Sequence, residues 1–280
     1  MIAIALALGA ALGWGASDFL GGLKSRAAPL LTVLLISQAT ALVLVTVLVT
    51  VRGASPPGMG SLGQAAAAGV AETVGVAALY RGLAVGRMSI VAPVAATAPV
   101  VPLLAGLATG EVPGTVQFGG LVLALLGLVI TSRRAGGEQD TTTRALPSVL
   151  YGLLAALGFG TFFFAMDGAS KGDVGWALLT ARLTATVVVA AVVVLSSHRV
   201  AVSRTDLRAV VAIGVLIVTA DTLYATASTY GLVGVVAVLG SLHTVVTMVL
   251  ARVFLKERLA RPQHVGIATS LLGVLAISVA

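Results

Sequence analysis

The chain has 280 residues, of which 58% are hydrophobic and only 10% are charged. An average soluble domain carries about 25% charged residues, so the composition excludes a water-soluble protein. The chain has no Cys, which excludes disulfides and thiolate chemistry. Its formal net charge of +7 would suggest nucleic acid binding in a soluble protein, but here it indicates loops that face an anionic membrane surface.

Ten hydrophobic runs follow one another along the chain, each long enough for a helix that crosses a ~30 Å hydrocarbon core. They lack the alternation of membrane β-strands, so we predict an all-α integral membrane protein. The first run has no basic segment before it and no convincing cleavage site, and we interpret it as a retained helix. The predicted spans are 2–22, 29–51, 62–85, 88–108, 115–132, 148–168, 175–196, 208–230, 234–254 and 262–280.

An internal repeat relates the two halves of the chain. A shift of 145 aligns Ala-Ala-Leu-Gly-Trp-Gly at 10–15 with Ala-Ala-Leu-Gly-Phe-Gly at 155–160, and a shift of 146 aligns Gln117 with Gln263. We predict repeats at 1–132 and 148–280, joined by a polar linker at 133–147. Because each half holds five spans, an odd number, the second must enter the membrane inverted. Two inverted five-helix repeats are typical of secondary transporters.

The repeated motifs also carry a resemblance to a known family. The chain resembles the drug/metabolite transporter (DMT) superfamily, in the bacterial ten-helix type with two EamA domains. This resemblance implies a central cavity between the halves and export of amino acids, metabolites or drugs. Family members often have an Arg in the second helix of each half; Arg182 matches this in the second half, whereas Ser37 and Gln38 stand there in the first. The matching residues are Leu-Gly-Trp-Gly at 12–15, then Gly110, Glu111, Gln117 and Gly120, and in the second half Lys256, Glu257, Gln263 and Gly266.

The distribution of positive charge predicts the orientation. Of the 17 Lys and Arg residues, fourteen fall in odd-numbered loops and the adjoining helix ends, whereas the even-numbered loops hold only Arg52 and Lys171. Positive loops stay on the cytoplasmic side. We therefore predict a multi-pass protein of the inner (cytoplasmic) membrane with both termini outside.

Charged side chains within the predicted spans are the first candidates for a transport pathway, because each costs ~2.5–3.5 kcal/mol on insertion scales. They are Asp18, Glu72, Arg182 and Asp221, with Glu72 close to the midplane. A structural ion pair is the alternative for Glu72 and Asp221, and a helix cap or a pair with Lys24 is the alternative for Asp18. Arg182 could clamp an anionic substrate or neutralise one of the carboxylates.

Further polar and aromatic candidates have two readings each. His243 could titrate within its span, or simply be hydrogen-bonded. Trp14 could line the cavity or pack as an ordinary aromatic residue. Glu111 and Glu257 each follow a span, and we predict that each caps the next helix instead of binding solute. Tyr224 is interpreted as a packing or interface residue.

Two irregular spans point to the position of the site. Pro93, Pro99 and Pro102 interrupt the fourth span, which must therefore bend or unwind. Irregular backbone at membrane depth is tolerated only against protein or a wet cavity. The symmetry mate, Gly-Ser-Leu-His-Thr at 240–244, is unusually polar, so the pair predicts a midplane site between the halves; a kink used only for packing is the alternative.

A stripe of small residues recurs in the fifth and tenth spans. It predicts close helix packing. Its members are Gly120, Ala124 and Gly127 in the first half and Gly266, Ser270 and Gly273 in the second.

The sequence as a whole predicts a secondary transporter that exports small organic solutes by alternating access. No P-loop occurs, so ATP is not expected to drive transport. Loss of hydration at the midplane disfavours the ionised form of a carboxyl group, which makes Glu72 the first candidate for a proton site in antiport and Asp221 the second. The predicted partners are a solute, protons and the lipid bilayer, with no nucleic acid, metal or cofactor and with a homodimer left open.

Two alternatives to a solute exporter stay open. The first is a flippase for lipids or lipid-linked metabolites on the same scaffold. The second, a membrane enzyme or scaffold, is disfavoured, because the His residues at 198, 243 and 264 fall on separate elements and form no cluster with Asp or Ser.

Overall fold

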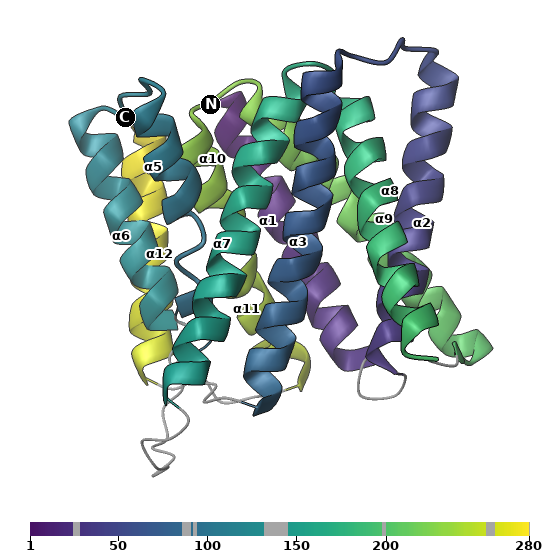
Figure 1. Cartoon of the computed structure of the whole chain (residues 1–280). Coiled ribbons are helices and arrows are strands. Elements are labelled where there is room, and N and C mark those ends of the chain that lie inside the picture. The colour runs from purple at the N-terminus through teal and green to yellow at the C-terminus, as the bar shows by residue number, and fades with distance from the viewer. Residues whose placement is uncertain are drawn as a thin grey trace.

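The computed structural model describes residues 1–24, 29–85, 91, 94–131, 145–197, 200–255 and 261–279, and the regular structure within these ranges is helical. The long helices stand side by side in one bundle (Figure 1). Seven of the described segments are long and apolar enough to cross a membrane, and Thr115–Ile130 is a shorter apolar one. The helices are α1 (Ile2–Lys24), α2 (Leu30–Arg52), α3 (Met59–Val85), α5 (Val100–Ala108), α6 (Thr115–Thr131), α7 (Ala145–Ser170), α8 (Val174–Leu195), α9 (Arg204–Ser228), α10 (Val233–Gly240), α11 (His243–Leu255) and α12 (Arg261–Val279).

Most helix ends lie within a few residues of the predicted spans, and the larger differences have local causes. Helix α9 begins four residues before the predicted span, because the Ser203 hydroxyl accepts a hydrogen bond from the Asp206 backbone N–H and also donates to the Asp206 carboxylate. Such a cap lets a helix begin in polar sequence, and a prediction from hydrophobicity alone misses that start. Helix α7 begins at Ala145, inside the predicted linker; the rest of that linker lies outside the described residues.

Both spans predicted to be irregular are interrupted. The ninth divides at Ser241 and Leu242 into α10 and α11. In the fourth, residues 96–99 form turns and α5 begins after Pro99. Pro102 lies in the first turn of α5, where backbone N–H groups have no partner within the helix, so it starts a helix without kinking one. Pro93 lies outside the described residues.

The helices that pack most closely come in pairs related by the repeat. Helix α3 packs along α7, and its counterpart α9 packs along α1. The paired helices are antiparallel: Gly75 faces Phe159, and Gly82, further along α3, faces Tyr151, which lies earlier in α7. Helix α1 begins and α12 ends at the same end of the bundle, the upper end in Figure 1.

Helices α6 and α12 pack together through the predicted stripe of small residues. A side chain at Gly127 would collide with the backbone of Ser270 and Gly266, and one at Gly120 would collide with Gly273. The prediction that this stripe serves helix packing is confirmed, since only small residues allow the two backbones to approach this closely.

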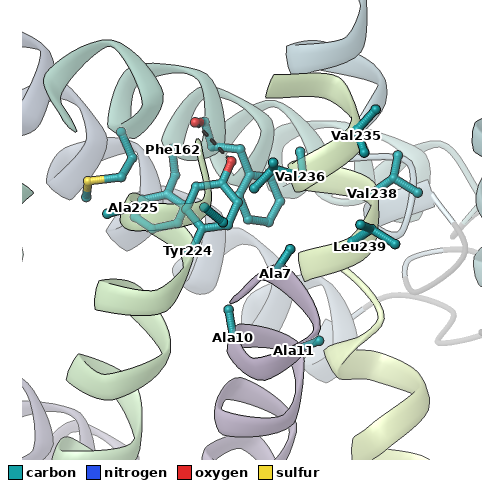
Figure 2. Close-up of a cluster of buried hydrophobic side chains, with 14 of the residues drawn as sticks. Ala7, Ala10, Ala11, Phe162, Tyr224, Ala225, Val235, Val236, Val238 and Leu239 are labelled. Atoms are coloured by element: carbon teal, nitrogen blue, oxygen red, sulfur yellow. Dashed lines mark hydrogen bonds between the residues drawn. The ribbon is translucent and has the colours of Figure 1, made fainter. Parts of the chain in front are cut away.

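We call the end where α1 begins the upper end and the end where it stops, at Lys24, the lower end. The upper half has a dense core around α10, of which every residue is buried. Ala7, Ala10 and Ala11 of α1 lie against this region, beside the stacked rings of Phe162 and Tyr224 (Figure 2). Alanine side chains permit this close approach of α1 to α10, and the upper half is consequently filled.

Candidate functional site

A cavity of about 480 Å³ lies between the two repeats in the lower half of the bundle. Its lining extends from Trp14 and Glu72, near the middle of their helices, down to Gly21 and Leu30 near the lower end. Residues of both repeats line it, and its volume is in the range of small-molecule sites. The cavity therefore lies in the lower half, whereas α10 and its neighbours are closely packed in the upper half.

A buried arginine lies behind the cavity wall, next to Glu72. Arg182 of α8 is 0% exposed, forms an ion pair with Glu72 of α3 and donates a hydrogen bond of 2.8 Å to the Gln38 side-chain oxygen of α2. Its Nε lies 3.4 Å from Asp221 Oδ2 of α9. We call Trp14, Gln38, Glu72, Arg182 and Asp221 the arginine cluster. Of the two readings of Arg182, the structure supports the counter-charge.

The arginine cluster holds two carboxylates against one guanidinium. Asp221 is 1% exposed; its Oδ1 accepts a hydrogen bond of 2.9 Å from the Trp14 indole, while Oδ2 has no hydrogen-bond partner among the described residues. Glu72 is 18% exposed and lines the cavity. With both acids ionised, the cluster carries one excess negative charge, and Glu72 is the acid that cavity contents can reach.

A second polar pair faces the cavity below the arginine cluster. His243 Nδ1, at the start of α11, lies 2.8 Å from Asp18 Oδ2 of α1, and both residues line the cavity. Lys24 instead forms an ion pair with Asp206, so the alternative pairing of Asp18 with Lys24 does not form. The Asp18 side chain is 46% exposed, which makes it the most accessible carboxylate of the site.

Aromatic rings form much of the wall above these acids. Trp14 lies 5.4 Å from Tyr224 and 6.1 Å from His243, measured between ring centroids. Trp14 therefore satisfies both of its readings, because it lines the cavity and also packs in an aromatic cluster with Phe162 and Phe163. Tyr224 is fully buried and its hydroxyl donates to the Phe163 carbonyl, as expected of a packing residue.

The six polar and aromatic residues predicted for the pathway lie together in this region. They are Trp14, Asp18, Glu72, Arg182, Asp221 and His243. Pro99 also lines the cavity, whereas Pro102 is buried in α5.

Two features of the site were missed from the sequence. Gln38 was noted only as the residue in place of an Arg, and the phenylalanines around 159–163 were not singled out. A lone amide in the apolar α2 and the run Phe162-Phe163-Phe164 were the available signals.

Three contacts join the two repeats at the upper end. The Glu111 carboxylate accepts hydrogen bonds from the backbone N–H of Val233, the first residue of α10, at 3.1 and 3.2 Å. Arg52 pairs with Asp173 at 3.0 Å, and the Trp176 indole donates to the carbonyl of Ala54 at 2.9 Å. The prediction that Glu111 caps the next helix is therefore wrong, because the carboxylate caps a helix of the other repeat.

The counterpart of Glu111, Glu257, lies outside the described residues. Among the residues that the structure describes, no group of three or more His, Asp or Glu side chains could hold a metal ion.

Comparisons with known proteins place this geometry in a wider context. The model of the EamA-like transporter family matches residues 1–133 and 146–279, which together make up nearly the whole chain. A solved structure described as "Crystal structure of protein" is 18% identical, with a TM-score of 0.83 over 99% of this chain and 96% of that chain; the likeness concerns the fold alone. None of the curated proteins matches.

Proposed function

The chain belongs to the EamA-like transporter family, a family of membrane transporters for small solutes within the DMT superfamily, and from this premise we propose that it exports small organic solutes in exchange for protons. The observation that carries the proposal is the cavity of about 480 Å³ in the lower half, lined by ionisable side chains from both repeats. The upper half has a filled core at the corresponding depth.

The proposed topology is ten spans arranged as two inverted repeats of five. It is supported by the antiparallel packing of the paired helices and by the shared end at which α1 begins and α12 ends. Among the described residues the lower end carries more positive side chains than the upper, which supports a cytoplasmic lower end with both termini outside. Described cations at the lower end are Lys24, Arg81, Arg208, Arg252 and Arg261, against Arg52 and Lys171 at the upper end.

Transport by alternating access follows from the contrast between the two halves. The cavity lining reaches Gly21 and Leu30 near the lower end, whereas Glu111 and the packed α10 join the repeats in the upper half. These features support a state that is open on the proposed cytoplasmic side. Rocking of the repeats would open the upper half and close the lower one around the same midplane groups. The breaks between α10 and α11 and before α5 supply the bending points.

Proton coupling is assigned to Glu72. Arg182 on α8 pairs with it, and Asp221 on α9 and Gln38 on α2 contact the same guanidinium. Asp18 and His243 line the same cavity. Because one guanidinium serves two acids, the excess negative charge can be neutralised either by a proton on Glu72 or by a cationic group of the solute. The two would exclude each other, which is the condition for antiport.

The test is a flux assay in proteoliposomes with and without a pH gradient, using a panel of small organic solutes. The wild-type protein is expected to accumulate its solute when protons flow the opposite way. Glu72→Gln should retain downhill exchange but lose the response to the gradient. Asp206→Asn is the matched control, since it also removes one carboxylate but lies outside the cavity lining, where it pairs with Lys24. Full pH-driven accumulation by Glu72→Gln would show that Glu72 is not the proton site.

One observation favours a second candidate function, a lipid flippase. An apolar groove of about 580 Å³ lies between α2 and α9, lined by residues such as Ile36, Val43 and Val211. A small cluster of Val33, Val210 and Ile213 lies between these two helices. A fluorescent-lipid scrambling assay in the same vesicles distinguishes the two functions, because a flippase accelerates lipid exchange between leaflets without any added solute.

A further inference from the structure

The charge balance of the cavity identifies the class of solute, an inference that rests on the proposed function. Three carboxylates belong to the site, those of Asp18, Glu72 and Asp221, and the guanidinium of Arg182 neutralises only one of them. With His243 neutral, two negative charges are left in excess. We infer that the site binds an organic cation with an aromatic or other apolar body.

Positive side chains do not reach the cavity from the described residues. Among the described residues that line it there is no Lys or Arg, and Arg182, at 0% exposed, lies behind the wall with its charge directed at Glu72 and Asp221. An anionic solute would therefore meet Asp18 and Glu72 with no accessible counter-charge. In a weakly hydrated space such repulsion is much stronger than in water.

The position of the accessible acids suits a cation. Asp18 and Glu72 lie on α1 and α3, both in the first repeat, and both line the cavity. Asp18 already contacts a neutral or protonated imidazole, and the 46% exposure of its side chain leaves oxygen surface for a second partner. Two carboxylates in one cavity attract a single positive charge, and this attraction offsets part of the cost of removing the cation from water.

The remaining wall suits an apolar body. Ring faces attract cations as well as apolar groups, and Trp is the most effective of the aromatic side chains in this respect. Most of the other lining residues are aliphatic. The aromatic residues of the wall are Trp14, Phe159, Phe162 and Phe163.

The experiment uses Trp14 as an internal reporter. The chain has two Trp residues, and Trp176→Phe leaves Trp14, in the cavity wall, as the only one. The purified variant is titrated with three probes that share a phenyl ring but differ in charge: benzyltrimethylammonium, benzyl alcohol and phenylmethanesulfonate. We expect the cation to change Trp14 fluorescence saturably, and to bind at least about tenfold more tightly than the neutral or the anionic probe.

Variants locate the binding site. Asp18→Asn removes one accessible charge outside the arginine cluster, and should weaken binding of the cationic probe about tenfold while leaving binding of benzyl alcohol unchanged. Asp206→Asn, which removes a carboxylate outside the cavity lining, should leave the affinity for both probes unchanged. Should Trp176→Phe fold poorly, the shift in melting temperature of the wild-type chain with each probe gives the same ranking, since a ligand stabilises the state it binds.

The outcomes separate this inference from the proposed function. Tighter binding of phenylmethanesulfonate, equal binding of all three probes, binding of none, or a cation affinity indifferent to Asp18→Asn would each overturn the cation site. The flux assay would still report a transporter of other solutes in those cases. Conversely, tight cation binding with no flux of any solute would leave the cation site standing and overturn transport.

Discussion

The upper and lower halves of this bundle are made from the same two repeats, yet the upper half has a packed core around α10 and the lower half contains the cavity. In the upper half the fully buried α10 packs against the alanines of α1, and Glu111 caps it. In the lower half a cavity lies between the repeats, and His243 at the start of α11 contacts Asp18 in its wall. The inverted repeat makes the upper half of one repeat equivalent to the lower half of the other, so the repeated architecture alone does not explain this difference. The proposed alternating access would explain it as a property of one conformation.

The arginine cluster lies between the two halves, and its disruption should have the largest effect on both. Arg182→Leu would leave Glu72 and Asp221 without a counter-charge, which costs about 3–5 kcal/mol for a broken buried pair. We expect loss of folded protein in detergent, measured by size-exclusion chromatography. The double variant Arg182→Leu with Asp221→Asn should recover folded protein without transport. Normal yield and transport by Arg182→Leu alone would contradict the counter-charge role.

The α6–α12 pair holds both halves together and is the next largest target. Gly127→Ala should lower the free energy of unfolding by about 1–3 kcal/mol, because its new methyl group meets the backbone of α12. Gly119→Ala is the matched control, since nothing lies within 4 Å of a side chain at that position. Melting temperatures of the two variants should differ clearly; equal values would mean that the helices separate without cost.

Glu111 offers a way to weaken the closed half alone. Glu111→Ala removes the cap of α10, worth about 1 kcal/mol, and should shift the equilibrium toward an open upper half about fivefold. The chain has no Cys, so Val236→Cys reports on the buried upper core and Met248→Cys on the cavity. A water-soluble maleimide should label the upper position faster in the Glu111→Ala background. An unchanged rate would exclude this cap as part of the closure.

The Arg52–Asp173 pair should make the smallest contribution to closure. The Arg52 side chain is 45% exposed, and exposed ion pairs contribute only about 0–1 kcal/mol. With a contribution of about 0.4 kcal/mol, near the middle of this range, Arg52→Gln should raise labelling of Val236→Cys about twofold, and the difference should vanish at high salt. A larger, salt-independent effect would assign the closure to this pair instead of Glu111.

Much of this comparison could be predicted from residue patterns, because in a membrane every polar side chain within a span is conspicuous. Glu72, Asp221 and Arg182 were found in that way. Under the shift of 145, Glu72 aligns with position 217, about one helical turn before Asp221, yet both acids reach the same guanidinium. That guanidinium comes from α8 alone, and Ser37 and Gln38 stand in the equivalent part of α2.

Other contacts could not be predicted, because nothing local indicates them. Glu111 and Val233 are 122 positions apart, and a backbone N–H has no sequence signature. Which half holds the cavity cannot be predicted from the sequence either, since both halves derive from one repeated pattern. Under the proposed alternating access, it would depend on small differences in packing free energy between two conformations of the same chain.

The stripe of glycines on α6 and α12 has a consequence for the origin of the chain. Gly120 lies against Gly273 and Gly127 lies against Ser270. The surface by which α6 contacts α12 is therefore equivalent, under the repeat, to the surface by which α12 contacts α6. A surface that complements its own copy does not require a covalent link. A single ancestral half, inserted into the bilayer in both orientations, could have paired with itself, and gene duplication would then have fixed one orientation for each copy. Co-expression of residues 1–132 and 148–280 as separate polypeptides should accordingly reconstitute a transporter.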